Sequence, residues 1–265
     1  MTGNSRQRLV LQPRDRHLLE ELATMRCIDR EQAKLVARFG STTRANARLL
    51  ALTRAGLLRR CFLGTTAGAT KALYMLSPKG AHAVGVPLRG PHRRKDEALI
   101  ADFFIEHQLH VNDTYCTLKY RPIPVLGVAF RCWTTFLEPL TPGIPLIPDG
   151  YVELETLSGI VSAFLEVDLG NESLAVWKEK VSNYLQLAAS GEVERRFGQA
   201  RFRVLVIAHS ERRVRSLRTA IAAATDKIFW LASLESIDRY GFFASLWFRP
   251  RAETAQPFIR PVTTP

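Results

Sequence analysis

Apolar residues in the first third of the chain recur at spacings that predict helices and then a β-hairpin. They follow a helical period over residues 14–25 and again after Asp29, a residue type that often caps a helix N-terminus. A third helical stripe ends at Gly56, a residue type common just past a helix C-terminus. Two short apolar runs within residues 57–77 flank a loop rich in Gly, Thr and Ala, which predicts two strands.

Three helices followed by a hairpin is the element order of a winged helix-turn-helix, a DNA-binding module. The third helix would enter a DNA groove, and the hairpin would form the wing. Basic and polar side chains lie off the apolar stripe of this helix and along the hairpin, and they suit phosphate and base-edge contacts. The alternative is a charged face that only contacts solvent. The candidate DNA-binding residues are Arg44, Asn46, Arg48, Arg54, Arg59, Arg60 and Lys71.

The uneven distribution of charge favours the DNA-binding prediction. The whole chain has 37 Lys and Arg against 25 Asp and Glu, a formal net charge of +12. Residues 1–95 contain 19 basic and 5 acidic side chains, whereas residues 96–265 contain 18 basic and 20 acidic ones. A basic excess confined to one segment points to a polyanionic partner for that segment. We therefore expect double-stranded DNA as the partner of the first segment and a different task for the second.

The second half has the pattern of an α/β sheet covered by helices, so the whole chain is expected to be α+β. We predict a winged-helix domain at residues 1–86, a basic linker at 87–95, an α/β domain at 96–248 and a flexible, proline-rich tail at 249–265. The elements predicted in the second half are a helix at 96–109, β-rich sequence to 130, strands at 144–154 and 159–170, a helix at 172–190, a strand at 202–210, a helix at 211–225 and short strands at 228–233 and 243–248.

Acidic residues on two neighbouring predicted strands form the candidate chemical site. Asp149 lies on the first strand, and Glu166 and Asp168 alternate on the second, so these two point to the same face. Carboxylates gathered on one face repel one another unless a cation lies between them, and Mg²⁺ or Mn²⁺ held there can activate a water at a scissile phosphate. The sequence therefore predicts a metal site at these three residues. A network of acids paired with arginines is the alternative.

The pair Pro148-Asp149 and the run Glu166-Val167-Asp168, followed by a helix, resemble the motif of the PD-(D/E)xK nuclease fold. The resemblance implies a restriction-endonuclease-like domain. It also implies that Asp149 and Glu166 bind the metal and that the carbonyl of Val167 helps them.

The chain departs from this motif at Asp168, which stands where the family has a lysine. Glu172 adds another acid at the start of the following helix. On that helix Lys180 and Tyr184 lie four residues apart and therefore share a face. Lys180 is the candidate to take over the role of the missing lysine. The alternatives are a different arrangement of the metal ligands and an inactive site.

The chain as a whole resembles the replication-relaxation family of plasmids and integrative elements, in the segments LQPRDRHLLEEL, LTRAGLLRR, YMLSPKGA, FLEVDLGNESL and KEKVSNYL. This resemblance, which extends to MOBC-type relaxases, implies an endonuclease or nickase that acts at an origin or transfer origin with Mg²⁺ or Mn²⁺. The resemblance leaves two kinds of protein partner open. These are replication or mobilisation proteins and a second copy of the chain. The alternatives are a non-catalytic DNA-binding regulator of replication or transcription and a partner-dependent nuclease subunit. The candidate catalytic residues are Asp149, Glu166, Asp168, Glu172, Lys180 and Tyr184.

Cysteine content and the lengths of apolar runs indicate in which cellular compartment the protein is expected. The four cysteines form no CxxC pair, so reduced thiols are expected. No apolar run reaches the roughly 18 residues of a membrane span, and the start of the chain lacks a signal-peptide pattern. We therefore expect a cytoplasmic protein that does not contact a membrane.

Overall fold

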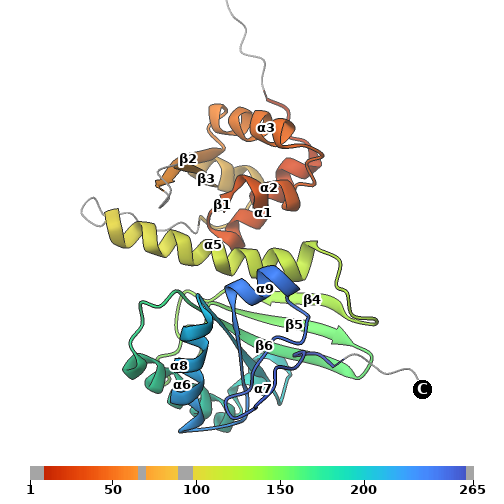
Figure 1. Cartoon of the computed structure of the whole chain (residues 1–265). Helices are drawn as coiled ribbons and strands as arrows, with labels where there is room; N and C mark the ends of the chain where they lie inside the picture. Colours follow the sequence, from red (N-terminus) through yellow and green to blue (C-terminus); the bar gives the residue numbers. More distant parts are fainter. Residues whose placement is uncertain (1–8, 65–69, 89–97, 261–265) are drawn as a thin grey trace, which may run out of the picture. The chain divides into compact units, whose positions relative to one another are not determined.

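The structure, a computed structural model, divides into two compact units, Met1–Cys116 and Thr117–Pro265. It describes residues 9–64, 70–88 and 98–260, without the side chains of 98–103. Figure 1 labels most of the helices and strands of the two units. Each unit has its own β-sheet, so the chain is a mixed protein of helices and two sheets, as expected.

The first unit contains the predicted helices and hairpin. Asp29 caps the second helix, because its Oδ1 accepts a hydrogen bond from the Gln32 N–H at 2.8 Å. Ser41 caps the third helix in the same way through the Arg44 N–H. The three-stranded antiparallel sheet has the order β1-β3-β2. The elements are α1 (Pro13–Met25), β1 (Ile28–Asp29), α2 (Arg30–Val36), α3 (Thr42–Arg54), β2 (Leu58–Gly64), β3 (Thr70–Leu76) and α4 (Pro78–Val84).

Helix α5 (Ala98–Tyr120) is longer than predicted, and most of it belongs to the first unit. The buried amide of Asn112 donates to the carbonyls of Met25 (3.0 Å) and Cys27 (2.6 Å), which ties the helix to the end of α1. The division between the units therefore falls inside α5 and not at the predicted linker. Of that linker, residues 89–95 lie outside the described ranges.

The second unit is built on a five-stranded sheet of order β4-β5-β6-β7-β8. The first three strands pair antiparallel, and β6, β7 and β8 run parallel. The C-terminal ends of the three parallel strands therefore meet at one edge of the sheet. The strands are β4 (Ala129–Thr134), β5 (Gly150–Thr156), β6 (Gly159–Asp168), β7 (Arg203–Ala208) and β8 (Phe229–Ser233), and the helices are α6 (Leu174–Ser190), α7 (Glu192–Phe197), α8 (Glu211–Ala222) and α9 (Leu234–Tyr240).

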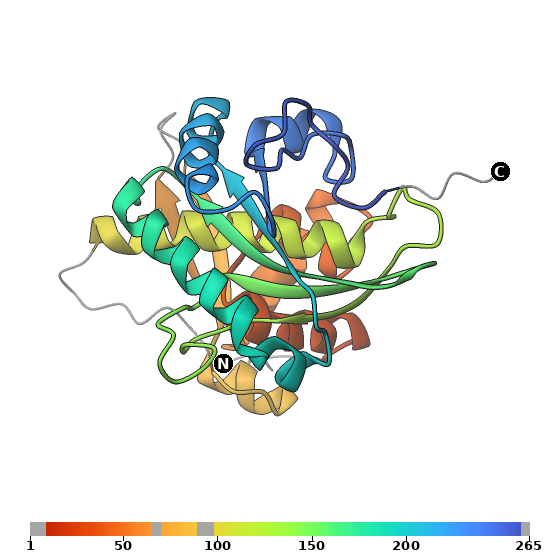
Figure 2. The same cartoon turned by 90° about the horizontal axis from the view of Figure 1, so that it is seen from below.

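Helices α6 and α8 cover one face of this sheet (Figure 2). Trp177 and Tyr184 of α6 and Leu217 of α8 are fully buried there. They pack with inward-facing strand residues such as Phe164 and Val206 in one hydrophobic cluster. Polar side chains on this face of β6 are therefore enclosed by the two helices, and this position creates the candidate site.

Two predictions about the second unit are wrong in detail. The strand expected at 144–154 begins only at Gly150, and residues 243–248 form isolated bridges but no strand. The tail predicted to be flexible from residue 249 is packed as far as it is described: Phe258 is 1 % exposed and lies among aromatic rings. Residues 261–265 lie outside the described ranges. The tail is ordered despite its high proline content because its apolar side chains are buried against the second unit.

The four cysteines, all within the described residues, form no disulfide with one another. Among the described residues, no helix is both long enough and apolar enough to cross a membrane.

Candidate functional site

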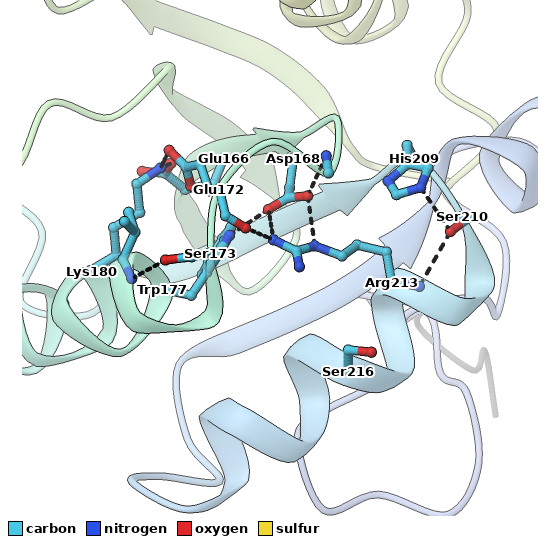
Figure 3. A network of polar contacts seen from close by, with 12 residues as sticks. Glu166, Asp168, Glu172, Ser173, Trp177, Lys180, His209, Ser210, Arg213 and Ser216 are labelled. Atoms are coloured by element: carbon cyan, nitrogen blue, oxygen red, sulfur yellow. Dashed lines mark hydrogen bonds and ion pairs between the residues drawn. The ribbon is translucent and has the colours of Figure 1, made fainter.

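Two of the predicted acidic residues, Glu166 and Asp168, lie at the C-terminal end of β6, where α6 covers the sheet (Figure 3). Glu166 and Asp168 both contact side chains of α6: Glu166 contacts Tyr184, and Asp168 contacts Trp177. The prediction that the two acids share one face of the sheet is therefore confirmed. Their environments nevertheless differ, and they belong to two separate networks.

Glu166 is 1 % exposed and is held by two donors from α6. Its Oε2 lies 2.9 Å from Lys180 Nζ, and its Oε1 accepts a hydrogen bond from the Tyr184 hydroxyl at 2.6 Å. Because residues four apart share a helix face, one helix delivers both donors to one carboxylate. Lys180 Nζ also lies 2.8 Å from Oε1 of Glu172. We call the group of Glu166, Glu172, Lys180, Tyr184 and Asp149 the carboxylate–lysine cluster.

Asp149 lies directly before β5 and is joined to β6 by two hydrogen bonds. Its Oδ2 accepts from the Val167 N–H at 2.7 Å, and its own N–H donates to the Leu165 carbonyl at 3.1 Å. These bonds place Asp149 beside the strand segment that carries Glu166. The charge of Asp149 also acts on Glu166, so the two side chains are near neighbours, and their joint role as metal ligands stays a prediction.

The electrostatics of the cluster follow from burial and from neighbouring charges. Burial raises the pKa of Glu166 to about 7; Lys180 opposes this shift, and the nearby negative charge of Asp149 adds to it. Burial acts to lower the pKa of Lys180, but Glu166 and Glu172 outweigh it and raise that pKa above its usual range. Burial and the Glu166 charge raise the pKa of the Tyr184 hydroxyl as well. Among the described residues, the carboxylates of Glu166, Glu172 and Asp149 thus act on the Lys180 ammonium group.

Asp168 belongs to a different network. Arg213 of α8 contacts it bidentately, with Nε at 2.9 Å from Oδ1 and Nη2 at 2.8 Å from Oδ2. The Trp177 indole N–H donates to Oδ2, and the Gly170 N–H donates to Oδ1 at 2.8 Å. Both carboxylate oxygens are therefore held by protein donors, and the structure does not bring Asp168 into the cluster as a metal ligand. This is the acid–arginine pairing that the sequence left as an alternative.

The sequence did not identify Arg213 as a partner of Asp168. The helix cap at Ser210 determines where Arg213 lies. Ser210 Oγ accepts a hydrogen bond from the Arg213 N–H at 3.3 Å, so Arg213 lies in the first turn of α8. Since β6 and β7 are parallel neighbours, α8 begins near the end of β6, within reach of Asp168.

The oxygen donors of the cluster suit a hard divalent cation. Glu172 Oε2 is buried and has no hydrogen-bond partner among the described residues, so it is an unsatisfied acceptor that could serve as a metal ligand. Within the described ranges no three His, Cys, Asp or Glu side chains already form a metal-holding group. Mg²⁺ commonly binds through only one or two carboxylates and keeps its waters and substrate phosphates as further ligands. Asp149 and Glu166 fit that pattern.

The candidate DNA-binding residues divide into exposed and structural groups. Arg44 and Asn46 on α3 are exposed, as are Arg54, Arg59 and Arg60. Lys71 is half-exposed and pairs with Asp29 at 3.0 Å.

Arg48 differs from the other candidates. Its Nε lies 2.9 Å from Oδ1 of the buried Asp15, Nη2 contacts Oδ2 of the same carboxylate, and Nη2 also donates to the Val10 carbonyl at 2.7 Å. The structure therefore uses Arg48 inside the unit, and the prediction that it contacts DNA is not supported by its geometry.

The protein is of the α+β class and has two compact units. The first unit consists of helices and a hairpin, and the mixed sheet of the second carries the buried carboxylate–lysine cluster. Residues 19–200 match the model of the replication-relaxation family, and because this match covers more than half of the chain, the protein belongs to that family. The family indicates a role in replication or mobilisation. No curated protein and no solved structure matches the chain.

Proposed function

We propose that this protein nicks DNA during replication or mobilisation of a plasmid or mobile element. The first unit binds duplex DNA through the exposed basic residues of α3 and the hairpin, and the second hydrolyses a phosphodiester with a divalent cation. The observation that carries the proposal is the buried carboxylate of Glu166, held between Lys180 and Tyr184 beside Asp149.

Each residue of the cluster has a task in this proposal. Asp149 and Glu166 would hold Mg²⁺ or Mn²⁺, which when bound acidifies a water and neutralises charge on the phosphate. Among the described residues, two carboxylates use two of the three N–H donors of the Lys180 ammonium, so the third is available to a phosphate oxygen. In the reaction a water oxygen bonds to phosphorus and one P–O bond of the strand breaks.

Tyr184 has a positioning task. It is fully buried, and its hydroxyl donates to Glu166. A hydroxyl enclosed behind the carboxylate does not reach a phosphate, so we assign it to orienting Glu166. Asp168 is likewise assigned to fixing the loop after β6 through Arg213, rather than to the cation.

The direct test is incubation of the full chain with a supercoiled plasmid that carries the element's own origin. With Mn²⁺ or Mg²⁺ we expect conversion to open circle, and EDTA or Asp149→Asn should prevent it. Equal conversion by Asp149→Asn, or in EDTA, would assign the cutting to another site or to a contaminant. Linear product would mean that both strands are cut.

A second candidate, a non-catalytic DNA-binding regulator, is favoured by one observation: Lys180 and Arg213 already neutralise Glu166 and Asp168 inside the unit. Calorimetry with Mn²⁺ separates the two. Heat of binding that Asp149→Asn abolishes supports the nickase. Absence of binding heat, together with DNA binding and no cutting, supports the regulator.

Arg44 and Arg48 are a matched pair for testing the DNA-binding unit. Arg44→Gln is expected to reduce the slope of log affinity for duplex DNA against log salt by about 0.9, the value for one lost phosphate contact. Arg48→Gln leaves the Asp15 carboxylate buried without its cation. It should lower the free energy of opening of α1 and α3 by about 2–3 kcal/mol. Hydrogen-exchange mass spectrometry of these helices measures the second effect. A normal exchange rate in Arg48→Gln, with a reduced salt slope, would return Arg48 to the DNA-binding set.

A further inference from the structure

The second unit contains a cavity of about 380 Å³ at the opposite end of its sheet from Glu166. The cavity is lined by the β5–β6 turn, the starts of β6 and β7, part of β8 and the packed tail. Val161 of β6 lines it, and Glu166 lies five residues further along the strand, about 17 Å away. The cavity is therefore separate from the carboxylate–lysine cluster, and its volume is in the range of small-ligand sites.

Three arginines line this cavity: Arg203, Arg249 and Arg260. The guanidinium groups of Arg203 and Arg249 lie 5.3 Å and 6.0 Å from the ring centre of Trp230. Among the described lining residues there is no Asp or Glu, and none of the three arginines has an acidic partner in the described part of the chain. Burial, followed by the positive charges of Arg260 and Arg249, lowers the pKa of Arg203. The cavity thus concentrates positive charge for which the described residues supply no acidic partner.

The same cavity has apolar walls that face solvent. Leu126 is 81 % exposed and Leu157 is 66 % exposed, and both line it. Guanidinium groups bind phosphate bidentately, and exposed apolar surface can pack against the face of a base. A duplex offers phosphates with its bases stacked inside, whereas an unpaired nucleotide offers phosphate and base together.

We propose that this cavity binds an unpaired nucleotide of a DNA strand, with its phosphate on Arg249 and Arg260 and its base against Leu126 and Leu157. The proposal rests on the proposed function in one respect: nicking at an origin produces a strand that can separate from its complement. The cavity would then hold that strand at a distance from the cutting site.

The test measures binding of an eight-residue thymidine oligonucleotide to the full chain in EDTA, so that cutting plays no part. Arg249→Gln/Arg260→Gln is expected to weaken binding by about tenfold or more and to reduce the salt slope by about 0.7, the value for the one phosphate that the two arginines share. Arg251→Gln is the matched control, because Arg251 is on the same segment, donates to the Ala222 carbonyl at 2.8 Å and does not line the cavity. Thymidine 5′-monophosphate should compete at least about tenfold less well than the oligonucleotide, because it lacks the neighbouring phosphates with which a strand also contacts basic residues outside the cavity.

The outcomes separate the rival ligands. Equal affinity and salt slope in all three proteins, or equal losses in the double variant and in Arg251→Gln, would overturn the site. Full competition by the mononucleotide would make the ligand a free nucleotide. A poly-glutamate peptide that loses binding in the double variant, while the oligonucleotide does not, would identify an acidic protein as partner. If the plasmid is not nicked but the slope changes as expected, the nickase proposal fails and the cavity proposal stands.

Discussion

Replacing Glu166 with glutamine is expected to lower the rate of plasmid nicking by at least about 100-fold. Glutamine has the shape of glutamate and can still accept the Tyr184 hydroxyl, but it lacks the negative charge that a divalent cation requires. The fold should persist, because the change removes a buried charge whose pKa is already raised to about 7. The measurement is the initial rate of open-circle formation in Mn²⁺, with DNA affinity determined in EDTA.

Glu179→Gln is the control for this variant. Glu179 is exposed on the same helix, one residue before Lys180, so it carries the same chemical change outside the cluster. We expect normal nicking from Glu179→Gln and normal DNA affinity from both variants. Undiminished nicking by Glu166→Gln would remove Glu166 from the reaction, and a parallel loss of DNA affinity would mean that it acts in binding.

Replacing Arg213 with methionine is expected to destabilise the second unit by about 3–5 kcal/mol. Asp168 has a fully buried side chain, and the guanidinium of Arg213 is its ion-pair partner. Methionine leaves a buried carboxylate with two neutral N–H donors, from Trp177 and Gly170, and no positive charge. The cost is that of an uncompensated buried charge rather than of one lost hydrogen bond.

Urea unfolding followed by tryptophan fluorescence measures this loss in the second unit alone, because all four tryptophans lie within Thr117–Pro265. Asp168→Asn/Arg213→Met should cost less than Arg213→Met, since no charge is left unpaired. Arg212→Met, at the exposed neighbouring position, should change stability little. If Arg213→Met is as stable as Arg212→Met, the ion pair does not hold the loop after β6, and Asp168 returns as a candidate metal ligand.

Local pattern accounts for much of the fold and for the centre of the site. The helical period and the caps at Asp29 and Ser41 place α2 and α3, because these features depend on residues within a few positions of one another. Strand alternation places Glu166 and Asp168 on one face, and the four-residue spacing brings Lys180 and Tyr184 to one carboxylate. The family itself is also evident from such segments.

The residues that decide the role of each charge are distant in sequence. Arg213 is 45 residues from Asp168, and Arg48 is 33 residues from Asp15. Sequence alone predicted Asp168 as a metal ligand and Arg48 as a DNA contact, since each has the right chemical type. The tertiary structure gives each a buried partner of opposite charge.

By itself, the sequence determined the helices and most of the strands of the two units, the family, and the acidic face of β6 with the lysine and tyrosine above it. Only the tertiary structure decided which acids remain for a cation, that α5 packs mainly with the first unit, and that the tail lines an arginine-rich cavity. The reason is physical. Periodicity and capping report the geometry of a single element, whereas the pairing of buried charges depends on which strands and helices become neighbours, as β6 and β7 do here.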